Sequence, residues 1–319
     1  MRIEVLALDH VFDLGLAAVL DAFQTANELN AALGVVARAF DVRVVGVRRA
    51  VTTAQGWRVP LRPIRGAAPD CVVVPAIGYK MPAPLEAALA RPDVRDAAAA
   101  LRERARGGSL MTAACIGTFV MAEAGVLDGQ RATTTWWLAP LFRRRYPRVV
   151  VEDARMVVQS GRVVTAGAAL SHMDLALWLI RRTSPRLAAL TAKYLIVDAR
   201  PSQSAYALAD HLVHTDPIVE RFEAWARARL KRPFSLATAA AAVGASKRTL
   251  ARRMQAVLGT TPLSYVQALR VERAVHLLKT GSASVDEVAS RVGYAEGATL
   301  RALLRRRLSA GVREIRRAR

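Results

Sequence analysis

Cys115 is the residue of this chain whose type and position best suit nucleophilic chemistry. It lies in the string GGSLMTAACIGTFVMAEAGVLDG, which predicts a buried strand, a sharp turn at Cys115 and a helix. A side chain at such a turn stands above the sheet edge, and the first amide groups of the following helix favour a thiolate and bind anions. A cysteine in an apolar strand is also a common core residue, so its position alone leaves both interpretations open.

A second pattern with chemical potential is a row of cationic side chains near the carboxyl end. In ASKRTLARRMQ, Ser246 is a predicted helix N-cap. The apolar residues Leu250, Met254 and Val257 then recur at the spacing of one buried helix face. The opposite face carries Lys247, Arg248, Ala251, Arg252 and Gln255. An arginine can donate hydrogen bonds to O6 and N7 of the same guanine. A short helix, a turn at Gly244 and this helix form a helix-turn-helix unit, whose second helix enters the major groove.

The same arrangement occurs a second time. The string SVDEVASRVGYAEGATLRALLRRR predicts a helix from Val285 and a break at Gly293. A further helix follows, which displays Arg301 and Arg305 on the side opposite its leucines. Between the two units, a long amphipathic helix is predicted after Pro262. The chain is therefore expected to carry two helix-turn-helix units joined by one rigid helix.

Residues 235–319 resemble the DNA-binding domain of AraC/XylS-type regulators. The matching segments are ASKRTLARRMQ, GTTPLSYVQALRVERAVHLL and EVASRVGY. The resemblance implies two recognition helices in successive segments of the major groove, about one helical turn apart. The implied DNA-binding residues are Ser246, Lys247, Arg248, Arg252, Arg301, Arg305 and Arg306. Double-stranded DNA is thus the expected macromolecular partner.

The second recognition helix departs from the family pattern. The family usually has phenylalanine where this chain has Met254, Leu300 and Leu304, and these replacements keep the positions apolar. Gly297 and Ala298, at the start of the second recognition helix, offer few side-chain atoms to base edges. We therefore expect the first helix-turn-helix unit to carry most of the sequence readout. The second helix-turn-helix unit is expected to bind phosphates through its arginines.

Alternating strands and helices in residues 1–184 position Cys115. Strands are predicted at Ile3–Leu8, Ala39–Val47 and Cys71–Pro75, and the first helix at Gly15–Leu29. Continuous apolar strands between helices are typical of a mostly parallel sheet with helices on both faces. The predicted fold class is therefore an α/β domain followed by an all-α domain with two helix-turn-helix units.

The amino-terminal part resembles the class I glutamine amidotransferase-like domain of the PfpI type, in the version fused to AraC-type domains in bacterial regulators. The matching strings are AACIGTFVMAEAGVLDGQRATTTWW, DCVVVPAIG and VVTAGAALSHMDLALWLI. The resemblance implies a sensing domain at residues 1–184, a helical linker at 185–232 and a DNA-binding domain at 233–319. In enzymatic relatives the elbow cysteine works with a histidine after the following strand and an acidic residue near the first helix.

These catalytic partners are incomplete in this chain. Thr135, followed by Trp136, stands at the position of the histidine, and without an imidazole Cys115 lacks its expected general base. His172, expected on a loop before a later helix, is the other histidine that could reach the site, and Asp21 is the nearest acidic residue on the first helix. We expect catalysis to be lost and the pocket to be retained.

A retained pocket suits a ligand sensor, because it is concave and already carries polar groups. The predicted ligand-binding residues are Asp21, Cys115, Ile116, Thr135 and Trp136. The expected effector is a small metabolite, either amino-acid-like or a quaternary amine whose cation faces the Trp136 ring. Trp136 as a core residue and Asp21 as a solvated helix residue are the alternatives.

Length and charge agree with two domains and an anionic partner. The chain has 319 residues, of which 53% are apolar, and a net charge of +21. At about 100–200 residues per domain this length suggests two domains, and the apolar fraction excludes wholesale disorder. Residues 233–319 carry 16 Lys and Arg against 5 Asp and Glu, a net +11, whereas the other 232 residues carry +10. The positive charge is thus concentrated where DNA binding is expected.

Other classes of protein find no support in the sequence. Two cysteines, Cys71 and Cys115, cannot form a disulfide framework. No uncharged apolar run reaches the ~20 residues that span a bilayer, and the amino terminus predicts a strand instead of a signal peptide. We expect a cytoplasmic protein without a membrane partner, a metal site or a cofactor, since neither a metal-ligand spacing nor a Gly-rich nucleotide loop occurs.

The function expected from the sequence is that of a transcriptional regulator, not of an enzyme. Its expected partners are double-stranded DNA, a small-molecule effector, a second copy of the chain and RNA polymerase. One alternative is a cysteine-dependent hydrolase of the PfpI type with an accessory DNA-binding tail, which fast alkylation of Cys115 would favour. Another is a general nucleic-acid-coating protein, whose salt-dependent binding would be similar for all sequences.

Overall fold

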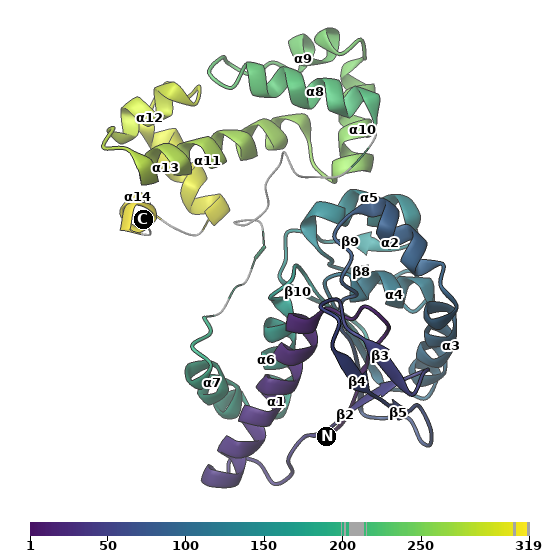
Figure 1. Ribbon diagram of the computed structural model, residues 1–319. Coiled ribbons are helices and arrows are strands. Elements are labelled where there is room, and N and C mark those ends of the chain that lie inside the picture. Colours follow the sequence, from purple (N-terminus) through teal and green to yellow (C-terminus); the bar gives the residue numbers. More distant parts are fainter. Residues whose placement is uncertain (199, 201, 204–213, 215, 309–310, 318–319) are drawn as a thin grey trace. The chain divides into compact units, whose positions relative to one another are not determined.

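The chain forms two compact units, Met1–Gln203 and Ser204–Arg319 (Figure 1). The computed structural model describes residues 1–198, 200, 202–203, 214, 216–308 and 311–317. The first unit is a mostly parallel sheet with helices, and the second is helical. The predicted fold class is therefore confirmed.

A seven-stranded sheet in the order β10-β11-β7-β6-β1-β2-β5 forms the centre of the first unit. Its strands are β1 (Arg2–Leu6), β2 (Asp41–Gly46), β5 (Arg62–Pro63), β6 (Cys71–Val74), β7 (Leu110–Ala114), β10 (Val157–Ser160) and β11 (Val163–Ala166). Neighbouring strands are parallel, except that β10 and β11 form an antiparallel hairpin. Two short pairs lie outside this sheet, β3 (Ala50–Thr52) with β4 (Arg58–Pro60), and β8 (Arg131–Ala132) with β9 (Val150–Val151).

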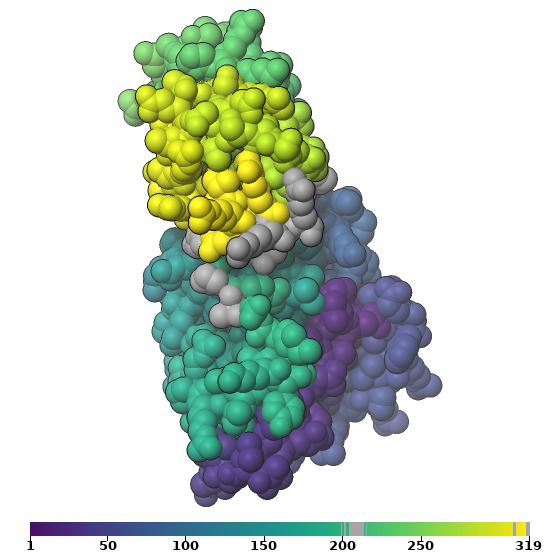
Figure 2. Space-filling view, turned by 90° about the vertical axis from the view of Figure 1, so that its left-hand side faces the viewer, coloured from purple at the N-terminus to yellow at the C-terminus, as the bar shows by residue number. Residues whose placement is uncertain are grey.

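Helices lie on both faces of the sheet (Figure 1). They are α1 (Asp13–Leu33), α2 (Pro82–Leu89), α3 (Pro92–Arg106), α4 (Gly117–Glu123), α5 (Ala139–Arg145), α6 (Ser171–Thr183) and α7 (Pro185–Tyr194), with a short 3₁₀ helix, η1, at Trp136–Leu138. Helix α1 packs against α6 and α7, and the space-filling view shows purple α1 beside these teal helices (Figure 2). The opposite face is covered by α2, α3 and α4, which pack on one another. Two-sided cover explains why the strands β6 and β7 are fully buried and, apart from Thr112, apolar.

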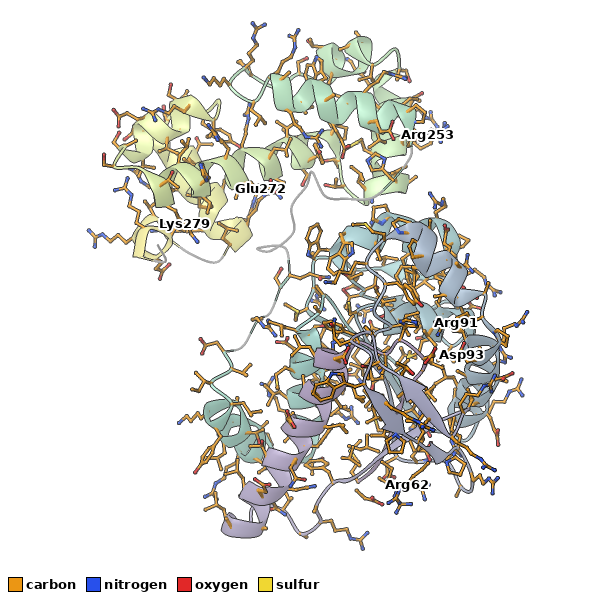
Figure 3. The ribbon with its side chains drawn as sticks, in the orientation of Figure 1. Arg62, Arg91, Asp93, Arg253, Glu272 and Lys279 are labelled. Atoms are coloured by element: carbon orange, nitrogen blue, oxygen red, sulfur yellow. The ribbon has the colours of Figure 1, made fainter. Side chains whose placement is uncertain are left out.

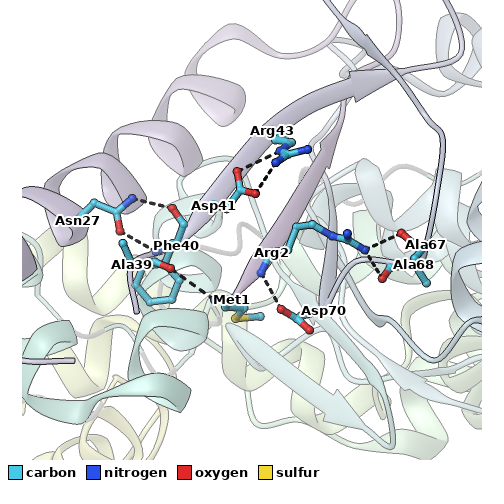
Figure 4. Close-up of polar contacts among 10 residues, drawn as sticks. All are labelled: Met1, Arg2, Asn27, Ala39, Phe40, Asp41, Arg43, Ala67, Ala68 and Asp70. Atoms are coloured by element: carbon cyan, nitrogen blue, oxygen red, sulfur yellow. Dashed lines mark hydrogen bonds and ion pairs between the residues drawn. The ribbon is translucent and has the colours of Figure 1, made fainter. Parts of the chain in front are cut away.

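Backbone contacts set the ends of α1 and β2, which differ by a few residues from the prediction. Helix α1 ends where Gly34 adopts a left-handed φ of +59°, and the Gly34 N–H donates to the Asn30 carbonyl at 2.8 Å. Strand β2 begins at Asp41 because the Asn27 side chain bonds both the N–H and the carbonyl of Phe40 at 2.8 Å (Figure 4). The N–H and the carbonyl of Phe40 therefore cannot form hydrogen bonds with a neighbouring strand.

The segment predicted as a helical linker, residues 185–232, is divided between the two units. Helix α7 packs on α1 and α6 in the first unit, whereas α8 (Pro217–Ala228) belongs to the second. Part of the predicted linker, residues 199, 201, 204–213 and 215, lies outside the described residues. The observed division at residue 203 thus differs from the predicted boundaries at 184 and 233, because the apolar faces of α7 and α8 are each buried within their own unit.

The second unit contains the two predicted helix-turn-helix units. Its helices are α8, α9 (Leu236–Ala242), α10 (Lys247–Leu258), α11 (Pro262–Thr280), α12 (Val285–Arg291), α13 (Gly297–Leu308) and α14 (Val312–Arg317). Helices α9 and α10 share a core with α8, which buries Leu250 and Met254. Helices α12 and α13 form a second core that includes Leu300 and Leu304. Helix α11 contributes side chains to both cores and so joins them.

Arg270 of α11 ties the turn of the second helix-turn-helix unit to the end of α8. Its guanidinium is 5% exposed, donates to the carbonyl oxygens of Leu230 and Arg232 at 3.1 and 2.5 Å, and lies over the Tyr294 ring. Gly293 adopts a φ of +85°, and a Cβ built there would lie 2.4 Å from the Leu230 carbonyl oxygen. Glycine is therefore required at this position by backbone conformation and by space.

We predict that Gly293→Ala destabilises the second unit more than Gly244→Ala. Both glycines have a positive φ, +85° and +68°, so each substitution carries the left-handed penalty of about 1–2 kcal/mol. Gly293→Ala adds the overlap with Leu230, whereas no atom lies within 4 Å of a Cβ built on Gly244. Thermal unfolding of the full chain followed by circular dichroism should show the lower Tm for Gly293→Ala. Equal losses would contradict the role of the close contact.

Candidate functional site

The carboxyl ends of the parallel strands meet at one edge of the sheet, where Cys115 lies. Cys115 follows β7 directly and precedes α4, as predicted, and it has a left-handed φ of +55°. Its N–H donates to the Ala166 carbonyl at 2.9 Å, and its carbonyl accepts from the Thr134 hydroxyl at 3.0 Å. A Cβ built on Gly117 would lie 2.2 Å from the Val74 carbonyl oxygen, so α4 starts in direct contact with the end of β6. The backbone geometry of a nucleophile elbow is therefore present.

The Cys115 thiol is not activated. The residue is 4% exposed, and burial raises the pKa of its thiol to about 12. The Ile116 N–H, the Thr135 hydroxyl and the Lys80 charge each lower this pKa but do not offset the burial. The expected effect of the helix terminus, a lowered thiol pKa, is therefore overturned, because an ionised thiolate is costly without solvent. At neutral pH the thiol stays protonated.

Thr135 and Trp136 lie next to this elbow. Thr135 is fully buried, and its hydroxyl has no hydrogen-bond partner of good geometry among the described residues. Trp136 is half-buried in η1 and packs edge-on against Trp137 with ring centroids 5.5 Å apart. The Trp137 indole N–H in turn donates to the Lys80 carbonyl at 3.1 Å. The structure thus brings Cys115, Ile116 and Thr135 together, with Trp136 as the next residue of the chain.

His172, the other candidate base, is already engaged by the backbone. Its Nε2 accepts the Ala76 N–H at 3.0 Å, and its Nδ1 lies 2.6 Å from the Ala169 carbonyl oxygen, to which it can donate only when protonated. The ring is fully buried, and burial lowers its pKa to about 4. Both nitrogens are therefore used by a neutral imidazole. Since Ala76 follows β6, its N–H holds His172 instead of offering a free donor to an oxyanion.

Asp21 is not part of this site, contrary to the prediction. It is exposed on α1, whereas the α1 residue that faces His172 is Gly15, where a Cβ would lie 2.6 Å from His172 Nε2. Asp21 lies six positions after Gly15, about 9 Å along a helix axis at 1.5 Å per residue. Asp21 therefore matches its alternative interpretation as a solvated helix residue. Because position 15 is a glycine, it offers no acidic side chain to the site in place of Asp21.

Arg91 holds two of the loops that surround the edge. It pairs with Asp93 at 2.9 Å (Figure 3), donates to the Asp9 carbonyl after β1 at 2.9 Å, and donates to the Tyr79 hydroxyl after β6 at 3.1 Å. Its guanidinium also lies 5.9 Å from the Tyr79 ring centroid. This link between α3 and two strand ends could not be inferred from sequence, because Arg91 and Asp9 are far apart in the chain.

Gln203 is a further polar residue that the sequence did not single out. It is 1% exposed, and its Nε2 donates to the carbonyl oxygens of Thr134 and Asp153 at 2.9 and 2.7 Å. Its Oε1 accepts the Ala168 N–H at 3.1 Å. The chain thus places its own carboxamide between the loops that follow β8 and β11. A buried glutamine in a Pro- and Ser-containing segment has no periodic signal by which sequence could reveal it.

The first recognition helix, α10, presents a free cationic surface. The Ser246 hydroxyl accepts the Thr249 N–H at 3.0 Å, which confirms the predicted N-cap. Lys247, Arg248 and Arg252 are exposed, and none of them makes an ion pair within the part of the chain that the structure describes. Arg253 instead turns toward the N-cap of α8 and pairs with Asp216 at 3.3 Å (Figure 3). The Leu250–Met254 face is buried as predicted, and Val257 is half-buried.

On the second recognition helix, α13, two of the exposed cations have partners within the second unit. Arg301, Arg305 and Arg306 are exposed. Arg301 lies 3.8 Å from the Asp286 carboxylate, and Arg306 donates to the Gln267 side chain at 3.4 Å. Asp286 also accepts the Gly297 N–H at 2.9 Å, and a Cβ at Gly297 would lie 2.4 Å from its oxygen. Gly297 is therefore required by its contact with α12.

Neither a membrane span nor a metal cluster is found in the described parts of the chain. No helix described is long and apolar enough to cross a bilayer. No group of at least three His, Cys, Asp or Glu side chains there could hold a metal ion.

Comparison with known proteins assigns a family to each unit. Residues 1–182 match the DJ-1/PfpI family, and residues 239–318 match a helix-turn-helix domain. The HTH-type transcriptional regulator GbdR of Pseudomonas aeruginosa is 31% identical over 198 residues, which cover 61% of this chain and 54% of GbdR. The chain thus spans about half the length of the first curated relative that it matches. ArgR, another regulator of that organism, is 26% identical over 247 residues, 76% of this chain and 72% of ArgR.

A solved structure has the fold of the first unit. The crystal structure of an AraC family transcriptional regulator from Pseudomonas putida superposes with a TM-score of 0.50 at 21% identity. The match covers 61% of this chain and 98% of that chain. At this identity the likeness concerns the fold.

Alkylation measures whether Cys115 is activated. In a Cys71→Ser variant, which isolates the Cys115 signal, the folded chain at pH 7.5 should react with iodoacetamide about 10³-fold more slowly than free cysteine. The reason is a thiol pKa of about 12 together with 4% exposure. The same variant in urea should react at the rate of a free thiol. Fast alkylation of the folded chain would contradict the buried, protonated thiol.

His172 should make the first unit less stable in acid. The pKa of this residue is lowered to about 4 in the folded chain, below the value of 6.5 that it regains on unfolding. Between these values the unfolded chain binds more protons, so stability falls from pH 6.5 to pH 4, by about 3 kcal/mol. Above pH 6.5 both states are neutral and this contribution does not change.

Denaturant unfolding at pH 7 and pH 4.5 measures the effect. His172→Gln removes the titrating group, so it should lose less stability than the unsubstituted chain between the two pH values. Equal losses in both chains would show that His172 is not the group responsible.

Proposed function

Since this chain belongs to the DJ-1/PfpI family and carries an AraC-type helix-turn-helix domain, we propose that it is a sequence-specific DNA-binding transcriptional regulator. The observation that carries this proposal is the surface of α10. Three exposed cations, Lys247, Arg248 and Arg252, follow a capped helix start and are not used in ion pairs within the described residues. Such groups are available for phosphates and guanine edges.

In this proposal the two recognition helices have different roles in DNA binding. Arg248 and Arg252 of α10 read bases, with Ser246 and Lys247 at the helix start. Arg301, Arg305 and Arg306 of α13 contact phosphates, because α13 begins with Gly297 and Ala298, which offer little to base edges. Arg270 supports both recognition helices, because it links the turn before α13 to the end of α8. Double-stranded DNA is the proposed partner, with RNA polymerase and a second copy of the chain as further partners in the cytoplasm.

The first unit is a sensor instead of an enzyme in this proposal. A thiol with a pKa of about 12 and a histidine engaged at both nitrogens do not make a nucleophile and its base. These two observations weigh against the hydrolase alternative. Cys115, Ile116, Thr135 and Trp136 are the proposed ligand-binding residues, and the buried hydroxyl of Thr135 supports a polar ligand there. A ligand would act by binding one domain arrangement more tightly than another.

Selection of binding sites from a random DNA pool tests the regulator and its division of labour. Arg248→Ala should relax the preferred base at one position, with a loss of about 1–3 kcal/mol for the selected site. Arg301→Ala should weaken binding to all sequences to a similar extent and lower the salt dependence. Arg102→Ala removes the same charge from an exposed position of the first unit and should change neither.

Two outcomes contradict this proposal. If the unsubstituted chain selects no preferred sequence, it is a general nucleic-acid-coating protein. If Arg248→Ala and Arg301→Ala relax sequence preference equally, the division between α10 and α13 is wrong.

A further inference from the structure

The carboxamide of Gln203 is bound as a ligand would be. Its Nε2 faces three oxygen acceptors: the Thr134 carbonyl at 2.9 Å, the Asp153 carbonyl at 2.7 Å and the Thr133 hydroxyl at 3.1 Å. Its Oε1 faces one donor, the Ala168 N–H at 3.1 Å. Every polar atom of the amide is satisfied while the residue is 1% exposed.

The surrounding backbone leaves space that fits this amide. A Cβ built on Gly167 would lie 2.5 Å from Gln203 Oε1 and 2.9 Å from its Nε2. The absence of a side chain at Gly167 therefore creates the room that the amide fills. The segment that carries Gln203 is held to the loop after β9 by the Gln203 N–H and the Ser202 hydroxyl, which both donate to the Ala154 carbonyl.

This carboxamide pocket, defined by Thr133, Thr134, Asp153, Gly167 and Ala168, adjoins the Cys115 elbow. The Thr134 hydroxyl donates to the Cys115 carbonyl at 3.0 Å. The Cys115 N–H donates to Ala166, the residue before Gly167. Thr135, the next residue after Thr134, is fully buried, and its hydroxyl lies beside the Cys115 thiol. A second buried hydroxyl thus lies close to a pocket that the chain itself occupies.

The arrangement of donors and acceptors selects one chemical class. A primary carboxamide presents N–H donors on one side and a carbonyl acceptor on the other, as the pocket requires. A quaternary ammonium has no N–H donor, a carboxylate would place negative charge against carbonyl oxygens, and a guanidinium has no acceptor for the Ala168 N–H. Of the two effector chemistries expected from the sequence, this pocket fits an amino-acid-like molecule with an amide and not a quaternary amine.

We propose that the effector site of the first unit is this carboxamide pocket, that Gln203 is its tethered occupant, and that a free primary carboxamide competes with Gln203 for it. The proposal rests on the proposed sensing function and names its ligand class. Gln203 is the last residue of the first unit, so a competing ligand would act where that unit ends. A tethered group competes at an effective concentration in the millimolar range, so an effector needs further contacts beyond those of its carboxamide.

Hydrogen exchange of the full chain, followed by mass spectrometry, tests the pocket through the Ala168 amide. In Gln203→Ala this amide loses its acceptor and should exchange at least about tenfold faster. Acetamide replaces the atoms that the substitution removes, so 100 mM acetamide should restore protection, whereas sodium acetate should not. Gln24→Ala, which removes an exposed glutamine on α1, should leave the exchange unchanged. In the unsubstituted chain, acetamide should accelerate exchange of the Gln203 N–H, which donates to Ala154.

A second variant separates recognition from packing. Gln203→Glu keeps the side-chain size but replaces the donors with a second oxygen, so it should also expose the Ala168 amide. Acetamide should restore protection here too, because repulsion from the Thr134 and Asp153 carbonyl oxygens keeps the carboxylate out of the pocket. The Cys115 amide, bonded to Ala166 inside the sheet, should stay protected in both variants and so reports that the unit is folded.

Three results would overturn the pocket: unchanged Ala168 exchange in Gln203→Ala, equal rescue by acetate and acetamide, or loss of Cys115 protection together with Ala168. The last would make Gln203 a residue of general stability. The measurement uses no DNA, so its failure is distinct from failure of the proposed regulator. A chain that shows this exchange pattern but selects no DNA sequence would contradict the regulator and leave the pocket standing.

Discussion

The backbone of Cys115 connects the parts of the first unit on which its function depends. Its N–H reaches Ala166 at the end of β11, and its carbonyl receives the Thr134 hydroxyl from the segment after β8. These bonds hold Cys115 in a strained, left-handed conformation directly after β7, with its thiol buried at the edge of the sheet. The geometry that exposes a nucleophile in an enzyme here surrounds a protonated thiol.

Two buried polar side chains at this edge bond backbone groups of the first unit. His172 accepts an N–H that follows β6, and Gln203 satisfies carbonyl groups that follow β8. Both side chains are buried, and both bind backbone groups that a substrate could otherwise have contacted. The proposed sensor needs only such binding of a neutral polar ligand, without a base.

In the second unit, helix α11 contributes side chains to both small hydrophobic cores and so joins them. Arg270 crosses from α11 to the end of α8 and to the Tyr294 ring, and Gly293 allows these groups to approach. Two recognition helices that must meet successive groove segments need a fixed relative orientation. The exposed cations of α10 are then presented from a rigid base.

The sequence by itself determined the features that depend on neighbours along the chain. These are the elbow position of Cys115, the Ser246 cap, and the buried face with Leu250 and Met254. Spacing predicts such features because helices and strands repeat at fixed periods. Tertiary structure decided the rest: that burial raises the Cys115 pKa, that Gly15 and not Asp21 faces His172, and that Gln203 fills a pocket. Solvent exclusion and contacts between distant segments have no periodic signal, so only the folded chain could reveal them.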